Sequence, residues 1–185
     1  MRFWNHFTAS IHLNDRQLSK RTEWTETAAY GLFAFAIPFF AGEPQWLIGA
    51  LVNMMLIMAA LNLDHTKWIP LAVLPSLGVL ARGLVWGPFT AYLVFLLPFI
   101  WLANGLLIWS IKYFSFYMRK KRYLAILYAA ILKTTLLTAA AAVLFTFELV
   151  PSAVLVFMSI LQLITALAGG LMALGAQNLL RRYSH

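Results

Sequence analysis

The sequence predicts an all-α membrane protein: a six-transmembrane-helix bundle with both termini cytoplasmic, preceded by a short amphipathic interfacial helix. The first observation is composition, because the 185 residues are 62% hydrophobic and 11% charged, with a mean hydropathy of +0.79. The second is length, because a helix needs roughly 20 apolar residues to cross a bilayer and most uncharged runs approach or exceed this. The runs are 27–42, 44–63, 68–81, 83–111, 123–147 (interrupted only by Lys133) and 149–180.

The third observation is that Lys and Arg divide between alternate loops. One side carries Arg82 together with Glu43 and Glu148. The other side is predicted to be cytoplasmic, because cytoplasmic loops accumulate Lys and Arg. There the positive charges meet anionic lipid headgroups, so the net charge of +8 indicates membrane lipid and no nucleic acid as a partner. The residues on the cytoplasmic side are Arg2, Arg16, Lys20, Arg21, Lys67, Lys112, Arg119, Lys120, Lys121, Arg122, Arg181 and Arg182.

Three segments make up the predicted domain organisation. Residues 1–26 form a cytoplasmic amphipathic segment that lies in the headgroup plane, with an aromatic face and basic residues around it. Residues 27–180 form the six-span membrane domain, and residues 181–185 form a cytoplasmic tail. Thr22 is the predicted N-cap of the first span. The start of the chain does not resemble a cleavable signal peptide, and the expected location is the inner or plasma membrane of a prokaryote, with multiple passes.

The connection between the third and fourth spans is the most broken apolar stretch. Proline and glycine recur from Pro75 to Thr90, so the third span either continues past Arg82 or is a half-length helix broken near Pro75. Irregular backbone at membrane depth is tolerated where it is buried in protein or lines a wet cavity. We therefore expect an outward-facing loop that contacts a ligand through Arg82 and Trp86. The alternative is an ordinary re-entrant turn without a ligand.

Small residues recur at four-residue spacing in the last two spans. Such surfaces let helix backbones approach closely in lipid, so they predict packing inside the bundle. Docking of another membrane subunit is the alternative. The pairs are Ala125 with Ala129, Thr134 with Thr138, Ala166 with Gly170, and Gly169 with Ala173.

Lys133 is the residue whose position most needs an explanation. It lies eleven residues beyond Arg122, roughly 16 Å along a helix, which is too deep for easy snorkelling. A lysine at the bilayer centre costs roughly 2.5–3.5 kcal/mol on insertion scales. No acid is expected at this depth, because all six Asp and Glu residues lie outside the spans or at span ends.

Three arrangements would compensate for this cost. Lys133 is neutral and hydrogen-bonded to polar neighbours, or it meets an acid of a partner subunit, or it meets an anionic substrate. Polar residues near mid-span make a small cluster possible, and a few polar groups among aromatic ones are typical of a small-molecule pocket. The predicted substrate-binding residues are Lys133, Asn104, Gln162, Arg82, Trp86 and Asn53, with Thr165 nearby.

The sequence carries no pattern typical of an enzyme. The four histidines lie at or beyond the predicted membrane surfaces without metal-ligand spacing, and the chain has no cysteine. No serine is embedded in a nucleophile motif, and no glycine-rich phosphate-binding loop occurs. We therefore expect neither catalysis nor a cofactor nor a metal.

The chain resembles the substrate-binding S component of energy-coupling factor (ECF) transporters. The resemblance covers the length, the six spans with cytoplasmic ends, and two sequence stretches. It implies a solvent-shielded pocket toward the outer half of spans four to six, a transmembrane coupling subunit and two cytosolic ATPases. The first span departs from the family's Ala-x-x-x-Ala pattern, because Ala34 and Ala36 are two residues apart. The two stretches are Pro75 to Pro98 leading into Trp101-Leu-Ala-Asn104-Gly105, and Leu161-Gln162-Leu163 followed by Ala168-Gly169-Gly170.

The predicted function is thus the substrate-binding membrane subunit of an uptake transporter for a small solute, either vitamin-like or an anionic metabolite. The alternative is a non-transporting envelope scaffold similar to the MreD family. In that case Lys133 and the small-residue faces would serve protein contacts, and the bundle would be filled. A ligand-sized cavity around Lys133 would favour transport.

Overall fold

The computed structural model describes residues 19–41, 43–64, 67–86 and 90–183, and every regular element in them is helical. The predicted interfacial helix near the N-terminus lies outside these residues. The helices are α2 (Lys20–Phe40), α3 (Gln45–Asn62), α4 (Ile69–Trp86), α5 (Thr90–Lys112), the π-helical turn η1 (Tyr113–Tyr117), α6 (Arg122–Thr146), α7 (Ser152–Val156), the π-helical turn η2 (Phe157–Leu161) and α8 (Gln162–Tyr183).

Hydropathy supports the membrane class that composition predicts. Four helical segments are long and apolar enough to cross a membrane, and one further apolar helix, Ile69–Gly83, is shorter. The described chain is therefore all-helical, as predicted, with four helical segments that could span a membrane. The four segments are Gln45–Asn62, Tyr92–Tyr117, Arg122–Thr146 and Ser152–Leu180.

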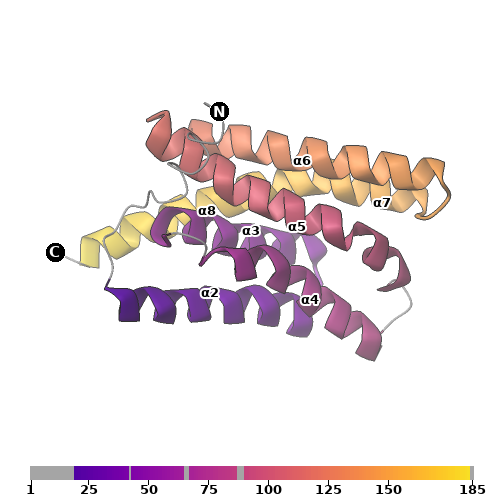
Figure 1. The fold of residues 1–185 in the computed structure, drawn as a ribbon, viewed down its shortest axis with the longest axis horizontal. Coiled ribbons are helices and arrows are strands. Elements are labelled where there is room, and N and C mark those ends of the chain that lie inside the picture. The colour runs from indigo at the N-terminus through magenta and orange to yellow at the C-terminus, as the bar shows by residue number, and fades with distance from the viewer. Residues whose placement is uncertain (1–18, 42, 65–66, 87–89, 184–185) are drawn as a thin grey trace, which may run out of the picture.

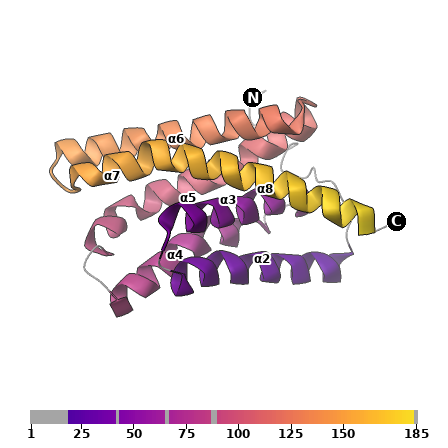
Figure 2. The same cartoon turned by 180° about the vertical axis from the view of Figure 1, so that it is seen from behind.

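The helices run back and forth along one long bundle (Figure 1). In both views α6 lies along one edge and α2 along the opposite edge, with α3 and α8 between them (Figures 1 and 2). The central helix α3 packs against α2, α5 and α8, while α4 packs against α2 and α5. We call the end that holds the start of α2 and the end of α8 the basic end, and the other the opposite end. Basic residues that lie at the basic end are Lys20, Arg21, Lys67, Lys112, Arg119, Lys120, Lys121, Arg122 and Arg182.

The apolar core fills the half of the bundle nearer the basic end. Every residue of α3 from Leu56 to Asn62 is buried, as expected for a central helix that is apolar on all sides. Leu107 and Ile108 of α5 and Ile126 of α6 pack into the same cluster. This part of the bundle is therefore closed.

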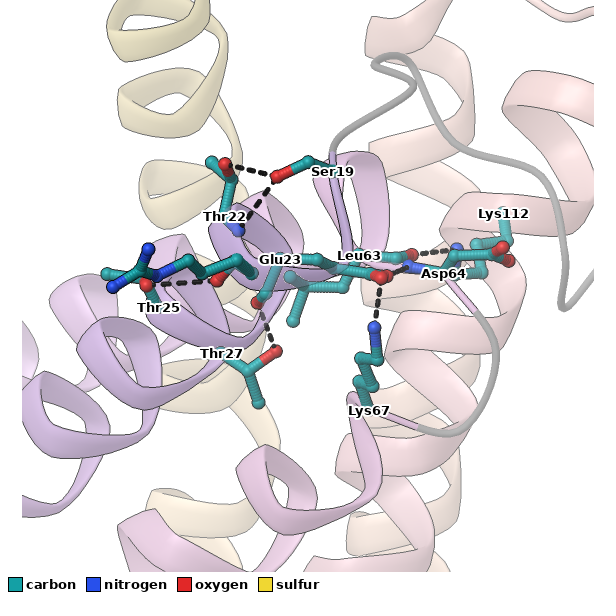
Figure 3. Close-up of polar contacts among 10 residues, drawn as sticks. Ser19, Thr22, Glu23, Thr25, Thr27, Leu63, Asp64, Lys67 and Lys112 are labelled. Atoms are coloured by element: carbon teal, nitrogen blue, oxygen red, sulfur yellow. Dashed lines mark hydrogen bonds and ion pairs between the residues drawn. The ribbon is translucent and has the colours of Figure 1, made fainter.

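A network of polar contacts ties the α3–α4 connection to α2 and α5 (Figure 3). The buried carboxylate of Glu23 accepts a hydrogen bond from the Asp64 amide at 2.7 Å. The same carboxylate forms an ion pair with Lys67. Lys112, predicted as a loop residue, is instead the fully buried last residue of α5, and its Nζ donates to the Leu63 carbonyl at 2.7 Å.

The predicted N-cap of the first helix is wrong by three residues. Ser19 is the N-cap, and its Oγ accepts a hydrogen bond from the Thr22 amide at 3.2 Å. Both residues are good capping types, and tertiary contacts favour the earlier start. Glu23 is thus the fourth residue of α2, and its side chain contacts the α3–α4 connection.

Of the two predictions for the third span, the one in which it continues past Arg82 is confirmed, because α4 is one helix from Ile69 to Trp86. The break near Pro75 is wrong, and so is the irregular loop as far as Trp86. Pro75 lacks an amide hydrogen, and polar neighbours stabilise this turn. Ser76 Oγ donates to the Val73 carbonyl at 2.8 Å and accepts from Trp101 Nε1 at 2.7 Å. Hydroxyl groups commonly satisfy backbone near proline in membrane helices. Residues 87–89 lie outside the described chain.

Small residues in α6 and α8 pack inside the bundle, as predicted. Ala125, Ala129, Ala166 and Ala173 are fully buried. A Cβ added at Gly169 would lie 2.5 Å from the Ala50 carbonyl oxygen, so α8 and α3 are in backbone contact there. This contact places Thr165 of α8 beside Asn53 of α3.

Candidate functional site: a cavity with two basic side chains

A cavity of about 340 Å³ lies between α2, α3, α4, α5, α6 and the η2–α8 segment. It reaches the opposite end of the bundle beside Ala41 and Gln45, which are exposed residues at the α2–α3 connection. Toward the basic end it stops at the level of Asn53, where the packed core begins. The cavity is thus a blind pocket, and its volume lies at the lower end of the range of small-molecule sites.

Lys133 lies at the wall of this cavity. Its side chain is 3% exposed, so it contacts neither lipid nor the membrane surface. Nζ donates a hydrogen bond to Asn53 Oδ1 at 2.6 Å. This contact agrees with the predicted pairing of Lys133 with a mid-span amide, and it leaves two of the three amine hydrogens uncommitted.

Asn53 is itself held in place by α8. Its Nδ2 donates to Thr165 Oγ1 at 3.3 Å, and Thr165 Oγ1 donates to the Gln162 carbonyl at 3.2 Å. A chain of hydrogen bonds therefore fixes the amide oxygen that receives Lys133. Such second-layer contacts orient a site more firmly than one side chain can.

Five of the six predicted site residues line the same cavity: Lys133, Asn53, Asn104, Gln162 and Arg82. Asn104 is buried, and its Nδ2 donates to the Ala72 carbonyl at 2.9 Å instead of approaching Lys133. Trp86 is the last residue of α4, and its side chain lies outside what the structure describes. That these residues bind a substrate remains a prediction.

Arg82 contributes the second basic group. Its Nη1 is buried and has no hydrogen-bond partner in the described chain. A buried guanidinium hydrogen without a partner is costly, because desolvation is not offset by a contact. An anionic group in the cavity would supply the missing acceptor.

The cavity wall holds no acidic residue among those the structure describes. Described acids lie at the two ends of the bundle, with Glu23, Glu26 and Asp64 at the basic end and Glu43 and Glu148 at the other. No group of three or more potential metal ligands occurs among the described residues. The arrangement therefore favours a ligand of negative charge over a cation.

The sequence did not predict the apolar wall formed by η2. Phe157, Met158 and Leu161 line the cavity from this π-helical turn. Thr138 Oγ1 donates to the Met158 carbonyl at 3.1 Å, which compensates part of the irregular backbone. Single π-helical turns inside α-helices are frequent at functional sites, but no residue pattern predicts where they occur.

Comparison of the chain with protein-family models, with curated proteins and with solved structures finds no match.

Proposed function

We propose that this chain is the substrate-binding integral membrane subunit of an uptake transporter for a small, negatively charged solute. The observation that carries the proposal is a ligand-sized cavity that two basic side chains line without an acid among its described residues. Buried polar groups in native proteins are nearly always satisfied. The partnerless Arg82 Nη1 and the uncommitted hydrogens of Lys133 therefore point to an anion.

We propose further that six helical segments span the membrane and that the basic end faces the cytoplasm. The support is the gathering of Lys and Arg at that end, since positive residues accumulate on the cytoplasmic side. In this orientation the cavity opens to the outside. A blind pocket that opens outward suits capture of a scarce solute.

Release into the cytoplasm then requires another protein. The packed core closes the basic-end half of the described bundle, and the sequence holds no phosphate-binding loop of its own. The resemblance to ECF S components supplies the kind of partner, namely a transmembrane coupling subunit with cytosolic ATPases. Co-purification of such ATPases with the tagged chain tests this part directly.

The alternative is an envelope scaffold similar to the MreD family. It predicts a filled bundle in which the small-residue faces serve other membrane proteins. The cavity of about 340 Å³ around Lys133 argues against this alternative. The small residues Ala125, Ala129 and Gly169 are already used within the bundle.

The test of the binding function is native mass spectrometry of the purified protein with and without Lys133→Met. We expect the wild-type chain to retain a small solute, because Lys133 lies buried at the wall of the cavity and no described acidic residue lines it. Lys133→Met should insert and express normally but lose the solute. Lys20→Met, an exposed position on α2, is the matched control and should retain it.

Two results together would end the proposal. They are a wild-type protein that carries no solute after gentle purification, and a Lys133→Met variant whose only change is higher thermal stability. In that case the amine would be a buried polar group without a ligand.

A further inference from the structure

We infer that the solute is an amphipathic organic acid, whose acid group lies at Lys133 and whose apolar body lies against Leu137 and the η2 wall. This inference rests on the proposed function and narrows its substrate class. It excludes inorganic oxyanions, sugar phosphates and nucleotides. Three features of the cavity carry it.

The first feature is that the hydroxyl groups of the cavity are already committed. Ser76 Oγ donates to Val73 and accepts from Trp101, and Thr165 Oγ1 donates to Gln162 and accepts from Asn53. Phosphate and sulfate carry three or four oxygens that need donors on several sides. A single carboxylate is satisfied by far fewer donors, and the two uncommitted hydrogens of Lys133 can supply them.

The second feature is the apolar surface next to Lys133. Leu137 follows Lys133 by one helical turn, so the two share a face of α6, and both line the cavity. Leu137 is 1% exposed. An acid group on Lys133 therefore places the rest of the solute over an aliphatic side chain, where sugar hydroxyls would lose their hydrogen bonds to water.

The third feature is the η2 wall, which faces the cavity with Phe157, Met158 and Leu161. Methionine adapts its shape to irregular apolar partners. The volume of about 340 Å³ lies at the lower end of the range for small-molecule sites. It therefore suits a small solute better than a nucleotide or a lipid.

Arg82 has a separate place in this arrangement. It lies near the C-terminal end of α4, in the part of the cavity nearer the opposite end. Its partnerless Nη1 can bind a second oxygen of the acid, or a polar group at the far end of the solute. Arg82→Gln should therefore weaken binding of the acid by about tenfold. Lys133→Met should have the larger effect, because it should remove the preference for an acid over a neutral analogue altogether.

The experiment is calorimetric titration of the protein in nanodiscs, after exchange of retained solute, with four probes of similar size. They are 4-phenylbutanoate, 4-phenylbutanol, 4-phenylbutylamine and glycerol 3-phosphate, with inorganic phosphate as a fifth. We expect the acid to bind at least tenfold more tightly than the alcohol, and the two phosphates to give no heat. In Lys133→Met the acid and the alcohol should bind alike, while Lys20→Met should behave as wild type.

The other outcomes overturn the inference in distinguishable ways. If either phosphate binds more tightly than 4-phenylbutanoate, the solute is a polar anion. The narrowed substrate class then falls, while the proposed uptake function stands. If no probe binds but native mass spectrometry still shows a retained solute, the narrowed substrate class also falls and the proposed uptake function stands. Preferential binding of the amine removes both the inference and the proposed function.

Discussion

The basic end and the cavity differ in how their buried charged groups are paired. At the basic end each buried charge meets a partner, as Glu23 does with Asp64 and Lys67. A second chain of hydrogen bonds runs from helix to helix through four elements of the bundle. It links Glu26 to Tyr30 in α2, then Asn62 in α3, Gln177 in α8 and Arg122 in α6.

The cavity instead holds basic groups with spare capacity. Lys133 has one partner, Asn53, and Arg82 Nη1 has none in the described chain. A buried charge with its partners in place holds the helices around it together, whereas a buried basic group with spare hydrogens is a reason to look for a ligand. The paired charges of the basic end therefore make it the fixed frame of the bundle, and the cavity half is the part that we propose binds the solute.

The largest expected effect is loss of the Glu23 carboxylate. Glu23→Ala leaves the Asp64 amide and the Lys67 ammonium without their acceptor, and removing one member of a buried pair costs about 3 kcal/mol. The free energy of unfolding is measured by denaturant titration in detergent. Glu43→Ala, at an exposed position, is the control and should change it by less than about 0.5 kcal/mol.

Glu23→Gln provides a second variant in case Glu23→Ala does not fold. The amide keeps an acceptor for the Asp64 amide but loses the ion pair, so its cost should lie between those of the control and of Glu23→Ala. Equal stability of all three variants would show that the basic end is not the rigid frame.

The second effect contrasts the two buried lysines. Lys112→Met leaves the buried Leu63 carbonyl without its donor, at a cost of about 1–3 kcal/mol. Lys133→Met removes a buried amine, and the Asn53 Oδ1 that loses its donor lies at the cavity, where water can replace the amine. We expect unchanged or higher stability of Lys133→Met in the absence of solute, measured by the same titration. A larger loss for Lys133→Met than for Lys112→Met would contradict the comparison.

Much of the architecture follows from local information. Hydropathy and the charges of the connections predict the helical bundle and the gathering of Lys and Arg at one end. The depth of Lys133 follows from counting residues beyond Arg122. These features depend on one helix at a time.

The features that the sequence did not predict depend on contacts between helices. Pro75 and its neighbouring glycine resemble a break, and only the Ser76–Trp101 contact shows how the turn is stabilised. Lys112 differs from the basic residues of the connections because its Nζ donates a hydrogen bond to the Leu63 carbonyl, which is far away in the sequence. The η2 wall depends on a backbone change that no residue type requires. Tertiary contacts override local preference at each of these places.

The smallest expected effect tests how firmly the cavity wall is held. Gly169→Ala puts a Cβ within 2.8 Å of the Asn53 Cβ and 2.5 Å of the Ala50 oxygen. Overpacking of about 1–3 kcal/mol is partly offset by about 1 kcal/mol of helix propensity, so the net loss of stability should be about 1 kcal/mol. Gly175→Ala is the matched control in the same helix, because no atom lies within 4 Å of its Cβ. It should stabilise the protein by up to about 1 kcal/mol.

Solute retention separates these two glycine variants more clearly than stability does. Displacement of Asn53 by Gly169→Ala moves the acceptor of Lys133, and a shift of a few tenths of an ångström weakens a preorganised contact. We therefore expect reduced solute retention in native mass spectra of Gly169→Ala and wild-type retention for Gly175→Ala. Full retention in both would mean that the α3–α8 contact supports the fold without positioning the site, and the division between frame and cavity would then lie elsewhere in the bundle.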